Sequence, residues 1–433
     1  MSRFLKITLK KDLLFQNKPT MKLQSFLLFL FILISPWVLY AQIEDVPNFS
    51  VSGRKYTLPI TIQANGYTRI DKPVEVQLNF STLLSQAGIN TSFSEKSLQL
   101  IEVSPSGEIL NSQIPFQFDK APEFEAGKKA LRTLVFLMQG ITAPNQSRYY
   151  KLYFDDKDHP ENPVKSLVSI QNIDAYEGYA AYKINTPTAE YYYHISSGGF
   201  ASIKDKEGKD WVSYHPNDEP ESGFMGRYRG IPNIAPPLFH PGSPEPKKYS
   251  KIIVEGPIKI SLMTETEDKQ WRTKWDIYPD YATMTLLQKG QEPYWILYEG
   301  TPGGEFNVED YWVRSNGTRE VMKPYLLKSQ WTGHLPSPKW VYFGDHQLDR
   351  VLYYIHHEDY PHEDVLWHSG DGGMTVFGFG RGPTQKNWQQ LSNAPAHLTL
   401  GFSEKNDFTF VGERINSAFK SLKISVGEVT KAE

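Results

Sequence analysis

The chain has 433 residues, a formal net charge of −3 and no cysteine, and 14% of its residues are aromatic. This length accommodates two domains and a large core, so the chain does not depend on disulfides for stability. The absence of long basic or acidic blocks argues against nucleic acid and membrane surfaces as partners, and the absence of cysteine excludes thiol nucleophiles and cysteine-based metal sites.

The first 41 residues are interpreted as an N-terminal extension followed by an export signal. Residues 1–20 are polar and basic, and from Met21 the chain has a lysine, an apolar run over 26–40 and then Ala41. This order is typical of a signal peptide, and the run is too short and too proline-interrupted for a membrane span. We expect cleavage after Ala41 and a periplasmic or secreted product with no membrane contact; an uncleaved anchor is the alternative.

Residues 44–157 are predicted to form a small β-sandwich. Five segments are β-branched or alternate apolar with polar residues, and turn sequences separate them. These segments are YTLPITIQA, VEVQLNF, SLQLIEV, RTLVFLM and RYYKLYF. Short strands at this spacing favour a sandwich, and because the domain has no cluster of acids or histidines, we expect a scaffold or sugar-binding role.

A charged, proline-bearing linker at 155–166 precedes a second, larger domain over 170–430. Roughly a dozen segments of this domain have the composition of strands and hardly any that of helices. Such content predicts two large antiparallel sheets packed face to face. The predicted fold class is therefore all-β, with an N-terminal β-sandwich followed by a larger antiparallel sandwich.

The segment YYYHISSGGFASIKDKEGKDWVSYHP, which starts at Tyr191, opens the larger domain. A strand ends at Gly198-Gly199, a strand returns, and Asp205 to Gly208 turn into the next one. This order resembles the opening of the galactose-mutarotase-like supersandwich, a fold shared by sugar epimerases and by domains of polysaccharide lyases and glycoside hydrolases. The resemblance extends over 175–430 in strand pattern.

In size and layout the whole chain is also similar to the ulvan oligosaccharide dehydratase and polysaccharide lyase type of marine polysaccharide-utilisation loci. The resemblance implies a secreted enzyme that acts on a uronic-acid glycan such as ulvan. No motif of that type matches this chain residue by residue, so its catalytic residues are not transferred to positions here.

The stretch from Ser213 to Gly242 is predicted to be a long irregular loop, because prolines and glycines break any period. Long loops inside compact domains are commonly functional. Two arginines around a tyrosine can bind a carboxylate or sulfate, and histidine transfers protons near neutral pH. We predict catalytic roles for Tyr228, Arg229 and His240 and substrate binding by Arg227, Asn233 and His215. The alternative is a surface crossover whose arginines pair with nearby acids.

Two further segments contribute candidate residues. In WILYEGTPGG, Tyr298 and Glu299 lie at the end of a predicted strand, where Glu299 could act as general acid or base and Tyr298 as proton donor. The alternative is a carboxylate paired with Arg314 or Arg319. In GFGRG, Arg381 lies among glycines that allow close approach to a ligand. We predict that Arg381 binds substrate, with an exposed charge in an open turn as the alternative.

The region from 340 to 368 is rich in histidine and aspartate. Imidazole and carboxylate are both metal ligands, but the spacing matches no established motif. If VLYYIHHE is a strand, His356 and His357 face opposite sides and cannot enter one site. We therefore predict no metal site and no cofactor, with a structural or substrate-bridging divalent metal as the alternative. His346 is assigned to substrate binding.

Together these residues predict β-elimination on an anionic oligo- or polysaccharide that contains uronic acid. The reaction needs a cation for the uronate carboxylate, a base for the C5 proton and an acid for the departing C4 oxygen. The candidates are Arg227 or Arg229 as cation, Tyr228, His240 or His215 as base, and Tyr298 or His346 as acid. A sugar leaving group defines a lyase, and water defines a dehydratase.

Three alternatives stay open. Hydrolysis of a glycosidic bond needs two carboxylates, for which Glu299 could pair with Asp276, Glu305 or Asp310. Epimerisation at C1 needs a histidine and a glutamate as acid and base. A non-catalytic glycan-binding protein would need only stacking aromatics and hydrogen-bonding groups.

Overall fold

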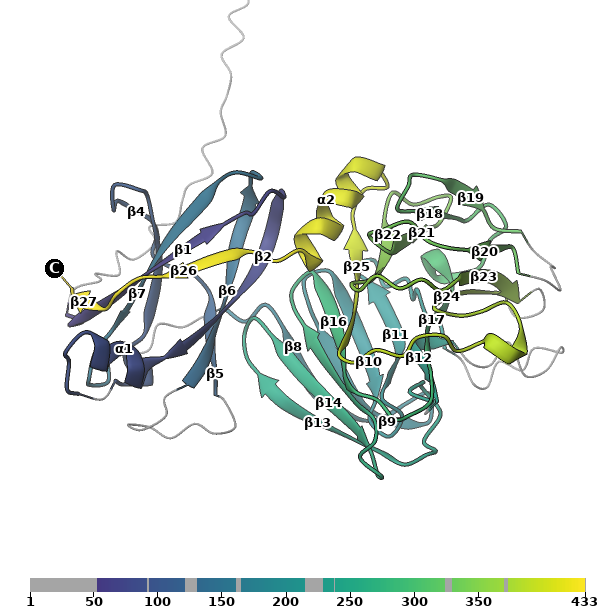
Figure 1. Cartoon of the computed structure of the whole chain (residues 1–433), viewed down its shortest axis with the longest axis horizontal. Helices are drawn as coiled ribbons and strands as arrows, with labels where there is room; N and C mark the ends of the chain where they lie inside the picture. Colours follow the sequence, from purple (N-terminus) through teal and green to yellow (C-terminus); the bar gives the residue numbers. More distant parts are fainter. Residues whose placement is uncertain are drawn as a thin grey trace, which may run out of the picture. The chain divides into compact units, whose positions relative to one another are not determined.

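The computed structural model describes residues 53–91, 93–120, 131–160, 165–214, 229–236, 238–323, 329–369 and 373–432. The predicted signal at 21–41 lies outside these residues. The prediction of an all-β fold is confirmed, because the described residues form antiparallel sheets with few helices (Figure 1). None of the described helices has the length and hydropathy that a membrane span requires.

The smaller β-sandwich consists of two sheets within the described residues, with the strand orders β26-β1-β7-β3-β4 and β2-β6-β5 and with β27 also paired to β1. Alternating side chains of β1, β2, β6 and β7 fill the core between the sheets. The strands are β1 (Tyr56–Gln63), β2 (Arg69–Asn79), β3 (Gln99–Val103), β4 (Ile109–Asn111), β5 (Phe116–Lys120), β6 (Leu131–Thr142), β7 (Ser147–Phe154), β26 (Lys423–Val426) and β27 (Thr430–Lys431). The helices are α1 (Phe80–Gln86) and η1 (Glu95–Ser97).

The C-terminal strands belong to this smaller sandwich. Ile60 of β1 is paired with Val426 of β26, and Tyr56 is paired with Lys431 of β27. The predicted second domain over 170–430 includes these strands, because a local pattern identifies a strand without identifying its partner. The chain therefore leaves the smaller sandwich after β7 and returns to it at its end.

The larger sandwich packs two sheets that each have nine strands among the described residues. The β17 sheet has the order β20-β23-β24-β17-β12-β11-β10-β9-β8. Its strands are β8 (Ser169–Tyr176), β9 (Tyr179–Asn185), β10 (Ala189–His194), β11 (Gly199–Asp205), β12 (Gly230–Ala235), β17 (Trp295–Gly300), β20 (Trp331–Gly333), β23 (Asp364–Ser369) and β24 (Met374–Phe379).

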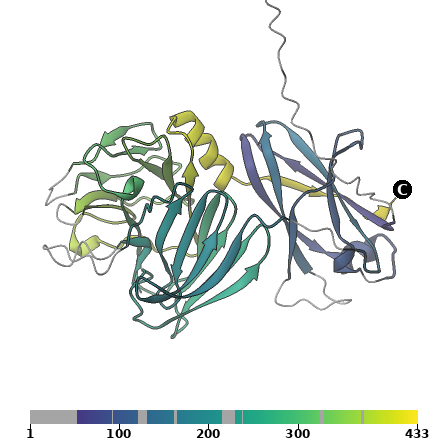
Figure 2. The ribbon, with the colours of Figure 1, turned by 180° about the vertical axis from the view of Figure 1, so that it is seen from behind.

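The β22 sheet has the order β13-β14-β15-β16-β25-β22-β21-β18-β19. Its strands are β13 (Lys248–Glu255), β14 (Ile260–Thr266), β15 (Arg272–Ile277), β16 (Tyr281–Gln288), β18 (Tyr311–Arg314), β19 (Arg319–Val321), β21 (Trp340–Gly344), β22 (Val351–His356) and β25 (Ala396–Ser403). Short helical turns η3 (Pro302–Gly304) and η4 (Gln385–Asn387) and the helix α2 (Phe408–Phe419) complete the fold. Figures 1 and 2 show the two sheets from opposite sides.

The two faces of the larger sandwich differ in what covers them. One hydrophobic cluster draws side chains from both sheets, for example Phe200 and Trp275, whose rings meet edge to face at 4.7 Å. On the outer side of the β22 sheet, Val411 and Ile415 of α2 pack against Tyr281. The outer side of the β17 sheet carries a small apolar cluster and the polar groups described below.

His368 in β23 provides a test of how the larger sandwich buries its polar side chains. Its side chain is buried beside Gln330 and Thr375, and burial lowers the pKa of His368 to about 4. Because the unfolded state then binds more protons between pH 4 and about 6.5, this histidine lowers stability as the pH falls through that window. In His368→Gln we expect the free energy of unfolding to vary less steeply between pH 6 and 5, by about 1.4 kcal/mol per pH unit. Urea unfolding of both proteins at several pH values measures this dependence. A free energy of unfolding that varies equally with pH in both proteins would contradict the buried neutral imidazole.

Candidate active site on the outer face of the β17 sheet

Strand β17 positions the candidate site because its side chains alternate between two environments. Ile296 and Tyr298 point into the core between the two sheets. Leu297 packs with Val376 of β24 on the opposite face. By the same alternation, Trp295 and Glu299 share that outer face with Leu297.

Two neighbouring side chains hold the carboxylate of Glu299. Asn233 of β12 donates from its Nδ2 to Oε1 over 2.9 Å, and His240 Nε2 lies 2.9 Å from Oε2. The indole N–H of Trp295 in turn donates to Asn233 Oδ1 over 3.4 Å. Glu299 is therefore fixed in orientation by groups from β12, from β17 and from the segment that follows β12.

His240 reaches Glu299 because the chain doubles back after β12. Backbone hydrogen bonds of 3.3 and 3.0 Å between Ile234 and Phe239 close this turn. The next residue after His240, Pro241, then lies against β11 and β12. A Cβ atom on Gly230 would stand 2.4 Å from the Pro241 ring and one on Gly199 2.7 Å from it. Both strands thus need glycine at these positions for the histidine segment to approach so closely.

The hydrogen bonds show that His240 and Glu299 share one transferable proton. The ring Nδ1 of His240 is 2.7 Å from the carbonyl oxygen of Pro241, which can only accept, so Nδ1 carries a proton. The contact between Nε2 and Glu299 Oε2 then requires one more proton, on the imidazole or on the carboxyl. With exposures of 1% for His240 and 8% for Glu299, the pair is an acid and base held out of bulk water.

Arg381, which follows β24, lies beside this pair among three tryptophans. Its guanidinium carbon is 3.6 Å from the ring centre of Trp367, 5.2 Å from that of Trp295 and 5.3 Å from that of Trp388. Its Nε and Nη1 are buried and donate no hydrogen bond within the described part of the chain. Burial lowers the pKa of Arg381 to about 10, and the charge of Glu299 opposes this shift.

A guanidinium with that pKa is still a cation at neutral pH. Buried cations are normally paired with an anion, because the loss of water is otherwise uncompensated. Here the cation has aromatic rings around it, and two of its buried N–H groups have no acceptor among the described residues, although the charge of Glu299 acts on it. This arrangement suits recognition of a planar anionic group such as a carboxylate.

The structure brings together four of the residues predicted from the sequence and separates others. Asn233, His240, Glu299 and Arg381 lie on one face of the β17 sheet. Tyr298 is buried on the opposite face, where its hydroxyl donates to the Trp211 carbonyl over 2.9 Å. Because it lies between the sheets and cannot meet a substrate there, we do not retain Tyr298 as proton donor.

The remaining predicted residues lie elsewhere or outside the described ranges. Arg229, just before β12, donates from Nη1 to the Ser213 carbonyl over 2.6 Å. His346 belongs to a separate group described below. Arg227, Tyr228 and His215 lie outside the described residues, so their predicted roles remain predictions.

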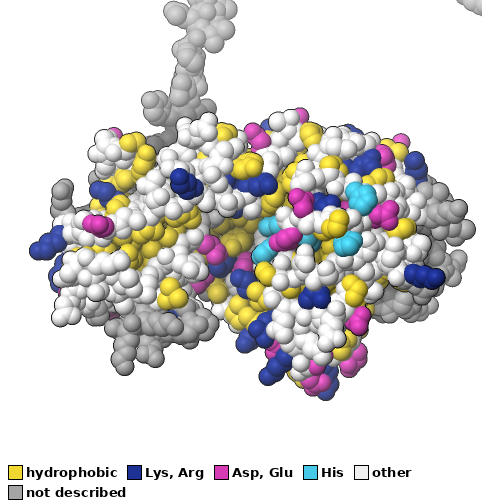
Figure 3. Space-filling model, in the orientation of Figure 1, with side chains coloured by type: hydrophobic (Ala, Val, Ile, Leu, Met, Phe, Trp, Pro, Cys, Tyr) yellow, Lys and Arg dark blue, Asp and Glu magenta, His cyan; other side chains and the backbone are white. Residues whose placement is uncertain are grey.

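Hydrogen bonds to protein groups hold the histidines at the end of β22 and in β25, although Figure 3 shows histidine and acidic side chains on the surface. His356 is buried, with Nδ1 3.0 Å from the Glu358 carbonyl, and His357 Nε2 is 2.8 Å from Thr399 Oγ1. His397 Nδ1 pairs with Glu358 Oε1 at 2.6 Å. Hydrogen bonds to protein groups therefore hold His356 and His357 in place.

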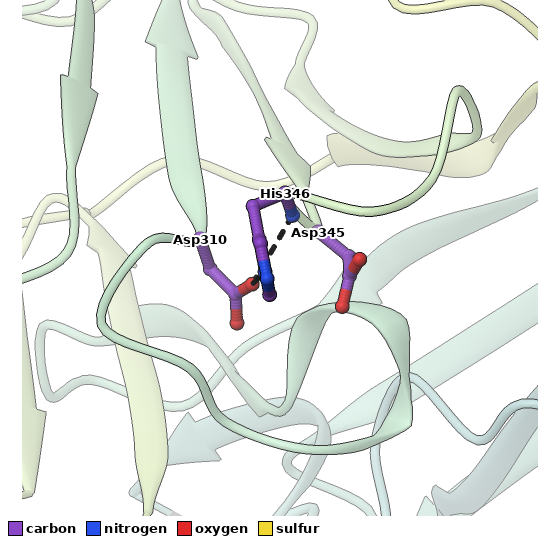
Figure 4. Close-up of side chains that lie close together, drawn as sticks. All are labelled: Asp310, Asp345 and His346. Carbon is purple, nitrogen blue, oxygen red and sulfur yellow. Dashed lines mark hydrogen bonds and ion pairs between the residues drawn. The ribbon is translucent and has the colours of Figure 1, made fainter. Parts of the chain in front are cut away.

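A different group has the composition of a metal site. Asp310, Asp345 and His346 offer ligand atoms that lie within 4.8 Å of one another, and no other such group occurs among the residues searched, which are the described ones. Figure 4 shows Asp310 ahead of β18 and the other two after β21. Burial, with a smaller contribution from Asp345, raises the pKa of Asp310 to about 6.

Sequence reasoning missed two features of these sites. The tryptophans around Arg381 come from three separate segments, and only Trp295 had an available signal, because alternation along β17 places it beside Glu299. The group around His346 needs Asp310, which is distant in sequence and becomes its neighbour only through the pairing of β18 with β21.

The fold and site define an all-β protein of two sandwiches that carries an acid–base pair and a buried cation on one sheet face. No protein-family model matches the chain, and no curated protein matches it. Among solved structures, an α-mannosidase from Enterococcus faecalis V583 aligns at TM-score 0.46 with 11% identity, covering 86% of this chain and 46% of that one. A glycosyl hydrolase family 38 protein from Enterococcus faecalis aligns at TM-score 0.45 with 12% identity, covering 86% and 47%. The chain thus spans about half the length of these two proteins.

A third alignment involves a shorter protein, the mutarotase candidate YeaD from Salmonella typhimurium. Its TM-score is 0.36 with 13% identity, and it covers 55% of this chain and 94% of that one.

Proposed function

We propose that the chain is a carbohydrate-active enzyme that carries out β-elimination on a uronic-acid oligo- or polysaccharide at the outer face of the β17 sheet. The observation that carries this proposal is the partly buried guanidinium of Arg381. Its Nε and Nη1 are buried with no acceptor within the described residues, and it interacts with the charge of Glu299 in the His240–Glu299 pair. A uronate carboxylate would supply the missing acceptor. Arg381 thereby takes the cation role first assigned to Arg227 or Arg229.

Elimination gives one role each to Arg381, Glu299 and His240. A base takes the C5 proton, the electrons of the C5–H bond form the C4=C5 double bond, and the C4–O bond breaks with its oxygen taking a proton from an acid. Arg381 pairs with the carboxylate at C6, so that negative charge which develops there is stabilised. Glu299, the more exposed member of the pair, removes the proton, and His240 Nε2 orients its carboxylate. Tyr228 remains our sequence-based candidate for the acid.

The tryptophans serve substrate binding in this proposal. Trp295 and Trp388 lie with ring centres 6.1 Å apart and an interplanar angle of 62°, and both are partly exposed. Partly exposed aromatic rings beside a few fixed polar groups are typical of ligand sites. The apolar face of a pyranose ring would pack on these rings while its carboxylate meets Arg381.

One observation also fits a second function. An imidazole and a carboxylate that share a proton are sufficient for proton transfer at the anomeric carbon, so epimerisation at C1 of a neutral sugar is the competing proposal. It gives no role to the cation of Arg381, which is why we rank it second. Hydrolysis has less support, because two candidate partners for Glu299 lie elsewhere. Asp276 accepts a hydrogen bond from Ser261 in the β22 sheet, and Asp310 lies in the group with His346.

The test is an incubation of the chain from Gln42 with uronic-acid polysaccharides and their lyase-derived oligosaccharides, together with neutral glycans. We expect the ultraviolet absorbance of a 4,5-unsaturated uronate to rise on uronate substrates alone. Product masses then separate chain cleavage, which defines a lyase, from loss of water, which defines a dehydratase. New reducing ends without absorbance would contradict elimination in favour of hydrolysis, and faster anomer exchange of a neutral aldose would favour epimerisation.

Location outside the cytoplasm is part of the proposal. The predicted signal at 21–41 would deliver the enzyme to the periplasm or the medium, where polymeric substrates are met.

A further inference from the structure

The group formed by Asp310, Asp345 and His346 lies outside the site proposed for elimination, and nothing in that chemistry uses it. Asp310 is completely buried and Asp345 is 8% exposed. The register of β18 and β21 pairs Tyr311 with Gly344, so the residues just beyond this pair, Asp310 and Asp345, stand opposite each other. Like charges directly opposite on paired strands repel one another.

In the part of the chain that the structure describes, no lysine or arginine side chain balances these two carboxylates. Within the described residues, Asp310 has an ion-pair contact only with His346, and Asp345 has none with lysine or arginine. Asp345 accepts one backbone hydrogen bond at Oδ1, from Gln347 over 2.6 Å, while its Oδ2 accepts none from the described part of the chain. Asp310 accepts backbone N–H groups at both oxygens, from Asn307 over 2.8 Å and from His346 over 3.4 Å. These bonds offset part of the cost of burying two neighbouring carboxylates, and a bound cation would offset the rest.

His346 completes the group from the loop after β21. Its Nδ1 lies 3.5 Å from Asp310 Oδ1, and its Nε2 lies 2.9 Å from Gln347 Nε2 and 3.4 Å from Glu309 Oε2. Because an amide nitrogen can only donate, Nε2 accepts from Gln347 and the ring proton is on Nδ1, facing Asp310. An ion bound at Nδ1 would displace that proton, and Nε2 could then carry a proton toward Glu309.

One ligand separation in this group matches a tetrahedral ion. In a tetrahedral Zn²⁺ site with ligands at about 2.0–2.2 Å, neighbouring ligand atoms stand roughly 3.3–3.6 Å apart. The separation between His346 Nδ1 and Asp310 Oδ1 is 3.5 Å. An octahedral Mg²⁺ site would require about 3.0 Å. One nitrogen and two carboxylate ligands also suit Zn²⁺ better than Ca²⁺, which prefers six or more oxygen atoms.

We propose that Asp310, Asp345 and His346 bind one Zn²⁺ ion, which ties the start of β18 to the end of β21. Gly303 of η3 lies against this group, since a Cβ there would stand 2.4 Å from Asp345 Oδ2. Because η3 follows β17 directly, the ion would also brace the segment that continues from Glu299. This inference takes up the alternative of a structural divalent metal, and it does not rest on the proposed elimination activity.

The experiment uses the untagged chain, stripped of metal with a chelator and titrated with ZnCl₂ in a calorimeter. We expect one Zn²⁺ per chain and a Tm that rises with the Zn²⁺ concentration. His346→Gln and Asp345→Asn should each weaken Zn²⁺ binding about 10–100-fold. Asp349→Asn, an exposed aspartate of the same loop, and His334→Gln, an exposed histidine elsewhere, should bind as the wild type does.

A stability measurement separates loss of the ion from loss of the fold. In chelator, Asp345→Asn should melt at or above the wild-type Tm, because it removes one of two opposed charges. A wild-type chain that binds no Zn²⁺, or His346→Gln and Asp345→Asn variants that bind it unchanged, would overturn the proposal. Binding of Ca²⁺ in place of Zn²⁺ would overturn the tetrahedral assignment. None of these results depends on finding the carbohydrate substrate.

Discussion

Arg381→Gln is expected to lower kcat/KM on uronate oligosaccharides at least about 100-fold, because it removes a charge-assisted, bidentate partner of the carboxylate. Arg381→Lys keeps the charge but loses the planar fork and its stacking on Trp367, so we expect it to be impaired as well. Steady-state kinetics followed by the absorbance of the unsaturated product measures both effects.

The stability of the Arg381→Gln variant discriminates between a ligand-binding and a structural role. Two N–H groups of Arg381 are buried without an acceptor among the described residues, so replacement of this arginine by a neutral side chain should leave the Tm unchanged or raise it. If Arg381 instead stabilised the fold, Arg381→Gln would lower the Tm. A variant that unfolds at lower temperature while keeping its turnover would contradict the proposed role of Arg381.

Arg319 supplies a matched control. Its guanidinium also lies 3.6 Å from an aromatic ring centre, that of Tyr311, but it is exposed on the short strand β19 in the other sheet. Arg319→Gln removes one arginine and one cation–π contact without touching the candidate site. We expect wild-type kinetics from it, and a comparable loss in both variants would point to a general effect of surface charge.

The sequence was sufficient for the fold class because alternation and composition are local properties. Most strands of both sandwiches are visible as apolar or alternating segments, and their number predicts two large sheets packed face to face. The partner of a strand is not local. The segment at Lys423–Val426 looks like its neighbours in sequence, yet it pairs with β1 at the start of the described chain.

The candidate site was predicted in part for the same reason. Asn233, His240, Glu299 and Arg381 each lie at a strand end or a proline- and glycine-rich turn, where composition marks them out. Their grouping depends on the register that aligns Asn233 with Leu297 and Leu297 with Gly378 across three strands. No property of a single segment encodes that register.

Tyr298 shows where the sequence already contained the answer. Adjacent residues of a strand face opposite sides of its sheet, so Tyr298 and Glu299 could not both serve one site from β17. The apolar alternation assigns Tyr298 to the core with Ile296, as the structure confirms. Asp310 and Asp345 are the opposite case, because their juxtaposition arises from strand pairing alone.

Glu299→Gln is expected to lower kcat about 10²–10⁴-fold while substrate binding persists, since the amide keeps the shape of the side chain but cannot take a proton. Kinetics with calorimetric binding of the same oligosaccharide measures the two effects separately. A non-catalytic glycan-binding protein would show binding without turnover in the wild type. A Glu299→Gln variant with unchanged kcat would remove this residue from the mechanism.

A double-mutant cycle with His240→Gln tests whether the two residues act as one unit. Because they share one proton across the 2.9 Å contact, the double variant should lose little more activity than either single variant. The matched control is Glu358→Gln, which disrupts another histidine–glutamate contact, the 2.6 Å pair with His397 in the β22 sheet. Additive losses at His240 and Glu299 would mean that each residue acts independently, and a loss in Glu358→Gln would show that such pairs matter for the fold and not for chemistry.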